Sequence, residues 1–171
     1  MMDLAKYIRD VPDFPKPGIL FKDITTLVKD PEAFRAAIQL LVDRYKDKKI
    51  DVVCAVESRG FIFGGALAVA LEAGFVPIRK PGKLPADTYR ETYELEYGTD
   101  SIEIHKDAIA PGQRVLVLDD LLATGGTVAA VVRLLSAFQC EIVEIAFLIE
   151  LDFLKGREKL AGHPVFSAVH F

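Results

Sequence analysis

The residue types best suited to chemistry stand together in residues 115–127, which read Val-Leu-Val-Leu-Asp-Asp-Leu-Leu-Ala-Thr-Gly-Gly-Thr. An apolar run ends in two adjacent acids, Asp119 and Asp120, and a short loop rich in Thr and Gly follows. In an open parallel sheet, ligands bind beyond the carboxyl ends of the strands. Glycines let a ligand approach the backbone, and a helix N-terminus offers unpaired N–H groups to an anion. The segment therefore favours a phosphate group with a polyol or a metal ion beside the carboxylates.

The same residues have a simpler interpretation, which they do not exclude by themselves. Two acids before a Gly-rich turn can cap a helix with solvated charge, and Gly-rich turns give many false matches. Two other phosphate-binding motifs are absent: there is no Gly-x-x-x-x-Gly-Lys pattern and no Gly-x-Gly-x-x-Gly pattern. The choice between capping and ligand binding therefore depends on the rest of the chain.

The elements that position this segment indicate an α/β fold. Asp30-Pro31 provides an N-cap with proline at the first helical position, and apolar residues follow at helical spacing. The β-branched run at residues 50–56 is typical of a strand buried on both faces. Strands alternating with helices predict one domain, residues 1–171, with a parallel sheet flanked by helices. Further strands are expected at 75–79, 114–118, 141–151 and 165–171, helices at about 60–73, 128–138 and 155–160, and a loop at 119–127.

Two segments depart from this alternation. Residues 11–18 contain three prolines and predict an ordered, extended arm. Residues 93–97 and 102–105 alternate apolar with polar side chains on either side of Gly98-Thr99-Asp100, which predicts a two-stranded hairpin with one wet face. A hairpin inserted into an α/β domain often serves as a lid.

Composition narrows the class of protein. A formal net charge of −4 over 171 residues argues against general nucleic-acid binding, which needs a basic face. The uncharged run at residues 61–71 is too short to span a membrane, and the opening Met-Met-Asp-Leu-Ala-Lys does not read as a signal segment. Cys54 and Cys140 lie in apolar surroundings, so buried, reduced thiols are favoured over a disulfide. We expect a cytoplasmic protein that binds neither nucleic acid nor membrane.

The form Leu-Leu-Ala-Thr-Gly-Gly-Thr in residues 121–127 resembles the phosphoribosyl pyrophosphate (PRPP) motif of type I phosphoribosyltransferases, as it occurs in those that use adenine. Other stretches match that family in order and spacing over nearly the whole chain. They are Pro15-Lys-Pro-Gly-Ile-Leu-Phe-Lys-Asp23, Glu57-Ser-Arg-Gly-Phe61, Ile78-Arg-Lys-Pro-Gly-Lys-Leu-Pro85 and Leu95-Glu-Tyr-Gly98.

The resemblance implies a type I phosphoribosyltransferase fold, with a β-hairpin lid at about residues 81–106 and an N-terminal arm that covers the base. It implies a pentosyltransferase of purine salvage that converts adenine and PRPP to AMP and pyrophosphate. It also implies a Mg²⁺ cofactor and a homodimer, for which the stretch around residues 60–71 has the apolar content.

The roles of individual residues also follow from the resemblance. Asp119 and Asp120 would hold the ribose hydroxyls directly or through water on Mg²⁺, which has no direct protein ligand and is held through PRPP and waters. The 5′-phosphate would bind the loop formed by Ala123, Thr124, Gly125, Gly126 and Thr127. Pyrophosphate would contact a loop expected to contain a cis peptide, together with a basic cluster. These residues are Glu57, Ser58, Arg59, Gly60, Arg79, Lys80 and Lys83.

The base and the lid complete the implied site. Phe21 would stack on the purine while backbone groups of Leu20 read its Watson–Crick edge. Ile19 belongs to the same covering segment, and Leu151 would close the other side of the ring. Glu96, on the lid, would manage the proton on the purine imidazole ring as a general acid or base. From the residues alone, Phe21 can equally be a core residue, the lysines a solvated patch and Glu96 a solvated side chain.

Three other functions remain to be weighed. The first is the same transfer to hypoxanthine, guanine, xanthine or orotate, against which the arm at residues 19–21 and the short loop favour adenine. The second is a PRPP-sensing regulator, which would need a DNA-binding segment or a basic surface that this acidic chain lacks. The third, a PRPP-making kinase, needs a second related domain and a longer chain.

Overall fold

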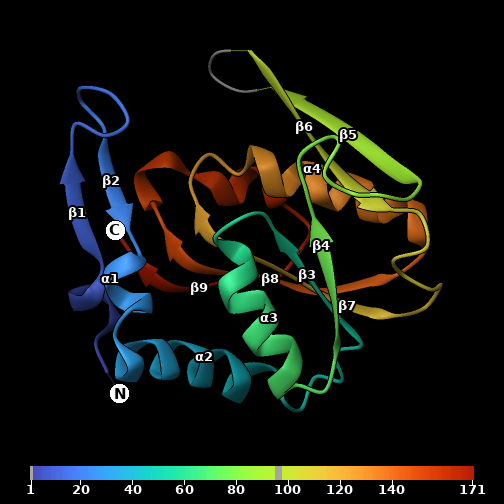
Figure 1. The fold of residues 1–171 in the computed structure, drawn as a ribbon, viewed down its shortest axis with the longest axis horizontal. Coiled ribbons are helices and arrows are strands. Elements are labelled where there is room, and N and C mark those ends of the chain that lie inside the picture. Colours follow the sequence, from blue (N-terminus) through green and yellow to red (C-terminus); the bar gives the residue numbers. More distant parts are fainter. Residues whose placement is uncertain (1, 95–97) are drawn as a thin grey trace.

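The centre of the molecule is a five-stranded sheet with the strand order β4-β3-β7-β8-β9 (Figure 1). The computed structural model describes residues 2–94 and 98–171. Every neighbouring pair in this sheet is parallel, as the alternation of elements predicted. The strands are β3 (Val52–Val56), β4 (Gly74–Ile78), β7 (Arg114–Leu122), β8 (Glu141–Glu150) and β9 (Val165–His170).

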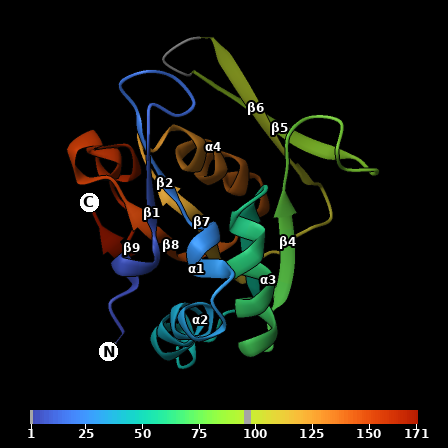
Figure 2. The ribbon, with the colours of Figure 1, turned by 60° about the vertical axis from the view of Figure 1, so that its left-hand side comes forward.

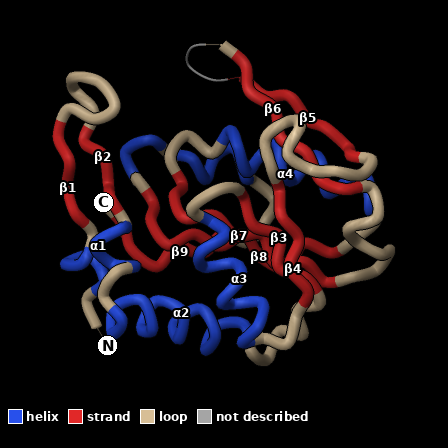
Figure 3. Tube along the Cα trace, viewed as in Figure 1, coloured by secondary structure: helices blue, strands red, loops and turns tan. Residues whose placement is uncertain are grey.

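Helices cover both faces of the sheet (Figure 3). One core packs α4 (Gly126–Leu135) against side chains such as Cys54, and the other packs the remaining helices against side chains such as Val53. Because consecutive strand residues point to opposite faces, β3 is buried throughout, which explains its uninterrupted apolar sequence. The second face is covered by α1 (Thr25–Val28), α2 (Pro31–Tyr45) and α3 (Gly60–Ala70).

The observed helix bounds agree with the predicted ones in some places and differ in others. The Asp30 side chain accepts hydrogen bonds from the backbone N–H groups of Glu32 and Ala33, so α2 begins at Pro31 as predicted. The helix predicted at 128–138 instead begins at Gly126 and ends in a 3₁₀ turn. The 3₁₀ segments are η1 (Leu4–Tyr7), η2 (Ser136–Phe138), η3 (Asp152–Leu154) and η4 (Gly156–Leu160), the last where a short helix was expected.

The prediction of a loop over residues 119–127 was wrong in its first part. Strand β7 continues through Asp119 and Asp120 to Leu122, where it still pairs with Glu150 of β8. The reason is that β8 is itself long, so it supplies backbone partners beyond the apolar run that ended the predicted strand. Both carboxylates therefore project from hydrogen-bonded strand rather than from a loop.

Two antiparallel hairpins project beyond the sheet (Figures 1 and 2). The arm hairpin pairs β1 (Arg9–Pro12) with β2 (Leu20–Asp23), so the predicted extended arm folds back on itself through a turn that contains a cis Phe14-Pro15 bond. The lid hairpin pairs β5 (Thr88–Glu94) with β6 (Thr99–His105). Its first strand was predicted at 93–97, of which 95–97 lie outside the described residues.

The lid hairpin is less open to water than its sequence suggested. Strand β6 is buried on both faces, since Ile102 and Ile104 join the α4 core while Ser101 and Glu103 are also covered. Glu103 exchanges backbone hydrogen bonds with Arg79 just after β4. The prediction of one wet face was therefore wrong for β6, and it holds better for β5, most of which is exposed or half-buried.

Two further predictions concern the whole chain. Both cysteines are free thiols, as predicted. The predicted burial is confirmed for Cys54, whereas Cys140 is half-buried. Among the described helices, none combines the length and the apolar character that crossing a bilayer would take.

Candidate active site

The two carboxylates at the end of β7 form the centre of the site. Asp119 Oδ1 accepts a hydrogen bond from the backbone N–H of Asp120 at 2.8 Å. Asp120 is buried, and its Oδ2 lies 2.8 Å from Nε of Arg59 in an ion pair. The geometry of that pair does not make a hydrogen bond, so Asp120 Oδ2 has no hydrogen-bond partner among the described residues. The charge of Arg59 therefore compensates this oxygen, and a ligand hydroxyl or a water on a metal ion would supply the hydrogen bond that Arg59 does not make.

Burial also disfavours the ionised form of both acids. Burial and the neighbouring charge of Asp120 raise the pKa of Asp119 well above its ordinary value. Burial raises the pKa of Asp120 as well, against the opposing charge of Arg59. Two adjacent carboxylates are hard oxygen donors that additional positive charge would stabilise. The pair therefore fits Mg²⁺ or its coordinated waters.

The loop between β3 and α3 reaches these carboxylates because Gly60 has no side chain. A Cβ on Gly60 would lie 3.0 Å from Asp119 Oδ1 and 3.3 Å from the Leu118 carbonyl oxygen. The Glu57-Ser58 peptide bond is cis, as the family resemblance implied. The loop predicted to contact pyrophosphate therefore lies directly beside the acidic pair, which it reaches at Gly60.

Glu57 connects that loop to the basic residues after β4. Its carboxylate accepts a hydrogen bond from the backbone N–H of Lys80, and Arg79 Nη2 lies 3.5 Å from its other oxygen. Glu57 therefore acts as an anchor for this strand end rather than as a free carboxylate. Of the residues predicted to contact pyrophosphate, the structure brings Glu57, Arg79 and Lys80 together.

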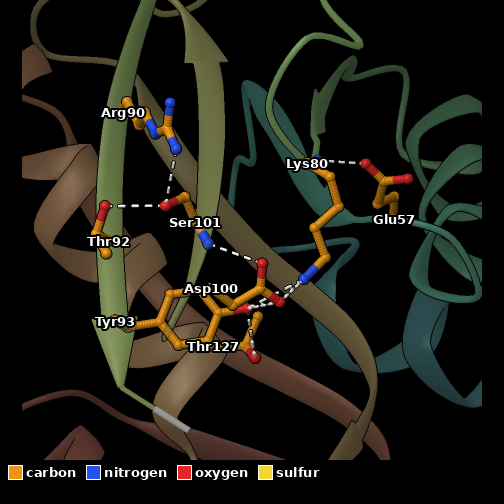
Figure 4. Close-up of polar contacts among 8 residues, drawn as sticks. All are labelled: Glu57, Lys80, Arg90, Thr92, Tyr93, Asp100, Ser101 and Thr127. Carbon is orange, nitrogen blue, oxygen red and sulfur yellow. Dashed lines mark hydrogen bonds and ion pairs between the residues drawn. The ribbon is translucent and has the colours of Figure 1, made fainter. Parts of the chain in front are cut away.

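The lid hairpin joins Lys80 to the predicted phosphate loop (Figure 4). Lys80 Nζ pairs with the Asp100 carboxylate, which also accepts a hydrogen bond from the Tyr93 hydroxyl at 3.2 Å. Thr127 Oγ1 in turn donates to the Tyr93 hydroxyl oxygen at 3.3 Å. Sequence reasoning missed Tyr93, although its place in the alternating hairpin pattern could have marked it as an inward side chain.

The predicted phosphate loop encloses a small cavity of about 70 Å³, lined by Asp119 and by residues 121–128. Helix α4 starts within it, at Gly126. Gly125 has φ of 79°, a left-handed conformation that favours glycine. The cavity therefore combines a helix N-terminus with close access to the backbone, which suits a phosphate group.

Phe21 lines an apolar cleft of about 400 Å³ between the arm hairpin and Arg59. Its ring packs edge-to-face on Phe14 with centroids 5.1 Å apart, and the Arg59 guanidinium carbon lies 5.1 Å from its centroid. Phe14 was not predicted, because nothing local distinguishes it from any other apolar residue of the arm. The cleft falls within the usual volume range of small-molecule sites.

Several predicted residues do not join these groups in this structure. Ile19 and Leu20 are exposed on the arm, 36% and 50% respectively, whereas Leu151 lies in the core beyond β8. None of them lines the cleft at Phe21. Lys83 is exposed and makes no hydrogen bond or ion pair with a described residue. Glu96 lies outside the described residues.

Comparison with known proteins adds independent evidence. The phosphoribosyl transferase domain model matches residues 23–167. An adenine phosphoribosyltransferase of Halothermothrix orenii is 61% identical over 166 residues, covering 97% of this chain and 98% of that protein.

Solved structures agree. The adenine phosphoribosyltransferase from Thermoanaerobacter pseudethanolicus has a TM-score of 0.95 at 53% identity, over 99% of this chain and 98% of that one. The Saccharomyces cerevisiae enzyme, in complex with adenine and an imino-altritol bisphosphate, has a TM-score of 0.90 at 44% identity, over 97% and 96% of the two chains.

The domain match runs from the end of the arm into β9, and thus includes both carboxylates and the loop beneath them. The chain therefore belongs to the phosphoribosyltransferase family, and its full-length identity with adenine phosphoribosyltransferases puts it in that branch. The type I fold predicted from the sequence is confirmed.

Proposed function

We propose that this enzyme transfers the phosphoribosyl group of PRPP to N9 of adenine, releasing pyrophosphate and supplying AMP by purine salvage. The observation that carries the proposal is the acidic pair Asp119–Asp120 beside a phosphate-sized loop cavity, in a chain similar to adenine phosphoribosyltransferases along its whole length. The complex of the yeast relative with adenine supports adenine as the base.

The sugar and its phosphate would be held at the end of β7. Asp119 and Asp120 would accept hydrogen bonds from the ribose hydroxyls, directly or through waters, and Asp120 Oδ2, which pairs with Arg59 without a hydrogen bond, suits that task. The loop from Ala123 to Thr127 would bind the 5′-phosphate through its backbone N–H groups. The two contacts fix the sugar at both ends, so that its reacting carbon is held in place.

Pyrophosphate would leave from carbon 1 of the ribose toward the loop between β3 and α3. Ser58, Arg59 and Gly60 would contact it beside the acidic pair, with Arg79, Lys80 and Lys83 supplying further positive charge. Catalysis would consist of positioning and electrostatic stabilisation as the bond to carbon 1 lengthens and N9 attacks with inversion. Mg²⁺ would be held through PRPP and waters beside Asp119 and Asp120, and when bound it would neutralise charge on the pyrophosphate.

The adenine ring would stack on Phe21 in the apolar cleft. In this structure the Arg59 guanidinium lies against the Phe21 ring. Ile19 and Leu20 are exposed, so the arm would have to close over the base to bring them into contact with it. Leu151 would contact the other face of the ring.

The proposed reaction is tested with a panel of free bases. Adenine, hypoxanthine, guanine, xanthine and orotate are each incubated with PRPP, and nucleotide and pyrophosphate are measured with Mg²⁺ and with excess chelator. We expect AMP from adenine in the presence of Mg²⁺, and no product with chelator. A different base reacting in place of adenine would overturn the base assignment. PRPP binding without turnover of any base would instead support a PRPP-sensing regulator.

Glu96 is proposed to move the proton of the purine imidazole ring. We expect Glu96→Ala to lower the single-turnover rate by about 100-fold or more, the scale of general acid–base catalysis, with little change in PRPP affinity. Glu94→Ala in the same lid hairpin provides a control with the same change of residue type. A single-turnover rate equal to that of the wild type would remove Glu96 from the mechanism.

We also propose that the enzyme is a cytoplasmic homodimer. Free thiols at Cys54 and Cys140 are compatible with a reducing compartment. Exposed apolar side chains on α3, with Val69 82% exposed and Ile62 39% exposed, favour a second copy of the chain as the cover for this face. Sedimentation equilibrium would give the mass of a dimer, and a monomer mass at micromolar concentration would contradict this assignment.

A further inference from the structure

The proposed phosphate loop rests on the backbone of a distant segment, residues 155–157. A Cβ on Gly125 would overlap the carbonyl oxygen of Gly156 and lie 3.1 Å from its carbonyl carbon. In the other direction, a Cβ on Gly156 would overlap the Ala123 carbonyl oxygen and lie 2.8 Å from Leu122 Cδ1. Two glycines thus allow the loop and the start of η4 to pack backbone against backbone.

The Gly156 side of this contact is fixed by an ion pair with a buried acid. Arg157 Nε lies 2.7 Å and 2.9 Å from the two carboxylate oxygens of Glu150, and Arg157 Nη1 donates to the Val165 carbonyl at 2.9 Å. Ser167 Oγ donates to Glu150 Oε2 at 2.6 Å. Burial opposes the charge on Glu150, but these hydrogen bonds outweigh it and hold the pKa of Glu150 below its ordinary value.

The loop side of the contact is attached to the same place in the sheet. Glu150 is the register partner of Leu122, the last residue of β7 before the loop. The next backbone N–H, that of Leu151, donates to the Leu122 carbonyl at 3.0 Å. Leu122 pairs with Glu150 in the sheet, and Gly156 is held near Glu150 by the ion pair of the neighbouring Arg157. The position of the loop relative to η4 is therefore constrained from both sides.

We infer that Gly156, held by the Arg157–Glu150 pair, is a positioning residue that sets the shape of the 123–127 loop for the 5′-phosphate. The inference rests on the proposed function, which assigns the phosphate to that loop. Gly156 would act through the backbone of Ala123 and Gly125 and would not itself touch substrate. A side chain here must push the Ala123 carbonyl or the Gly125 turn outward, and a misplacement of about 1 Å in a catalytic geometry can lower the rate by about 100-fold.

The test uses Gly156→Ala, with Gly74→Ala as its matched control. A Cβ on Gly74 meets its nearest atoms at 3.6 Å and 3.8 Å, which is ordinary contact. Binding of ribose 5-phosphate and of magnesium pyrophosphate is measured separately by titration calorimetry, together with KM for each substrate and the melting temperature. We expect Gly156→Ala to weaken ribose 5-phosphate binding at least tenfold, with magnesium pyrophosphate binding unchanged. KM should rise for PRPP and not for adenine.

The outcomes separate this inference from the proposed function. Wild-type enzyme that fails to bind ribose 5-phosphate would overturn the phosphate assignment itself. Wild-type binding with equal affinity in Gly156→Ala would overturn the positioning role alone, as would an equal loss of both ligands. If Gly156→Ala does not fold, Arg157→Lys keeps the charge but loses the forked contact. It should weaken ribose 5-phosphate at least threefold and spare pyrophosphate, and a loss of neither or of both would overturn the role.

Discussion

Replacing Asp119 and Asp120 together by asparagine is expected to lower kcat/KM for PRPP by about 1,000-fold or more and to leave the fold intact. Asparagine keeps the shape of each side chain but removes the negative charge that is proposed to face the ribose and the waters on magnesium. Losing one preorganised electrostatic contact costs about 100- to 1,000-fold in comparable sites, and here two are lost. The measurement is steady-state kinetics at saturating adenine, with thermal unfolding followed by circular dichroism.

The stability of this variant separates a functional role from a structural one. Burial already disfavours two adjacent charges at this position, so their removal relieves repulsion, although Arg59 loses its partner. Since Arg59 is about one-third exposed, water can solvate it. We therefore expect a melting temperature within a few degrees of the wild type. The double variant Asp43→Asn with Asp47→Asn changes the net charge equally at exposed positions and should retain full activity.

Near-native turnover by the Asp119→Asn, Asp120→Asn variant would show that the ribose is bound elsewhere. An inactive variant that also unfolds at room temperature would mean that the two acids act through the fold, which the buried position of Asp120 makes a meaningful alternative. The two results are distinguished by the melting curve and the rate taken together.

The parts of the site that could be predicted are those whose chemistry is carried by one short segment. Asp119, Asp120 and the glycines after them are adjacent in the chain, and Asp119 and the glycines line one cavity, with Asp120 next to it in β7. The end of β7 was misplaced because it depends on the length of β8, which the local sequence of β7 does not contain.

The residues that were missed act through contacts that depend on how the chain folds back on itself. Gly156 matters because its backbone meets Ala123, Phe14 because the arm folds back onto Phe21, and Tyr93 because it meets Thr127. Spacing within one segment could have marked Tyr93 as an inward side chain, but it does not identify the residue that any of the three contacts. Of the four residues predicted to bind the base, only Phe21 lines the cleft, since Ile19 and Leu20 are exposed on the arm and Leu151 is buried in the core.

Arg59→Ala is expected to lower kcat/KM for PRPP by about 100-fold or more and to move the acid limb of its pH profile to higher pH. Arg59 is proposed to contact pyrophosphate, and its guanidinium also pairs with Asp120. Its charge opposes the effect of burial on the pKa of both Asp119 and Asp120. Without it, both pKa values rise further.

The sign of the shift follows from which form of the acidic pair is active. In the proposed mechanism the ionised carboxylates bind the ribose hydroxyls, so activity is expected to fall as the pH falls through their raised pKa values. Removing Arg59 raises those values and therefore shifts the loss of activity toward neutral pH. The measurement is kcat/KM for PRPP between about pH 5 and 9, with Arg59→Lys expected to keep the limb near that of the wild type because it retains the charge.

Lys83→Ala separates the two roles assigned to Arg59. Lys83 is proposed to contact pyrophosphate too, but it is exposed and pairs with neither carboxylate. We expect Lys83→Ala to raise KM for PRPP without moving the acid limb. If Arg59→Ala behaves in the same way, with weaker PRPP use and an unshifted limb, Arg59 acts on pyrophosphate alone. A shifted limb in Arg59→Ala only would show that one guanidinium both binds the leaving group and keeps the acidic pair ionised.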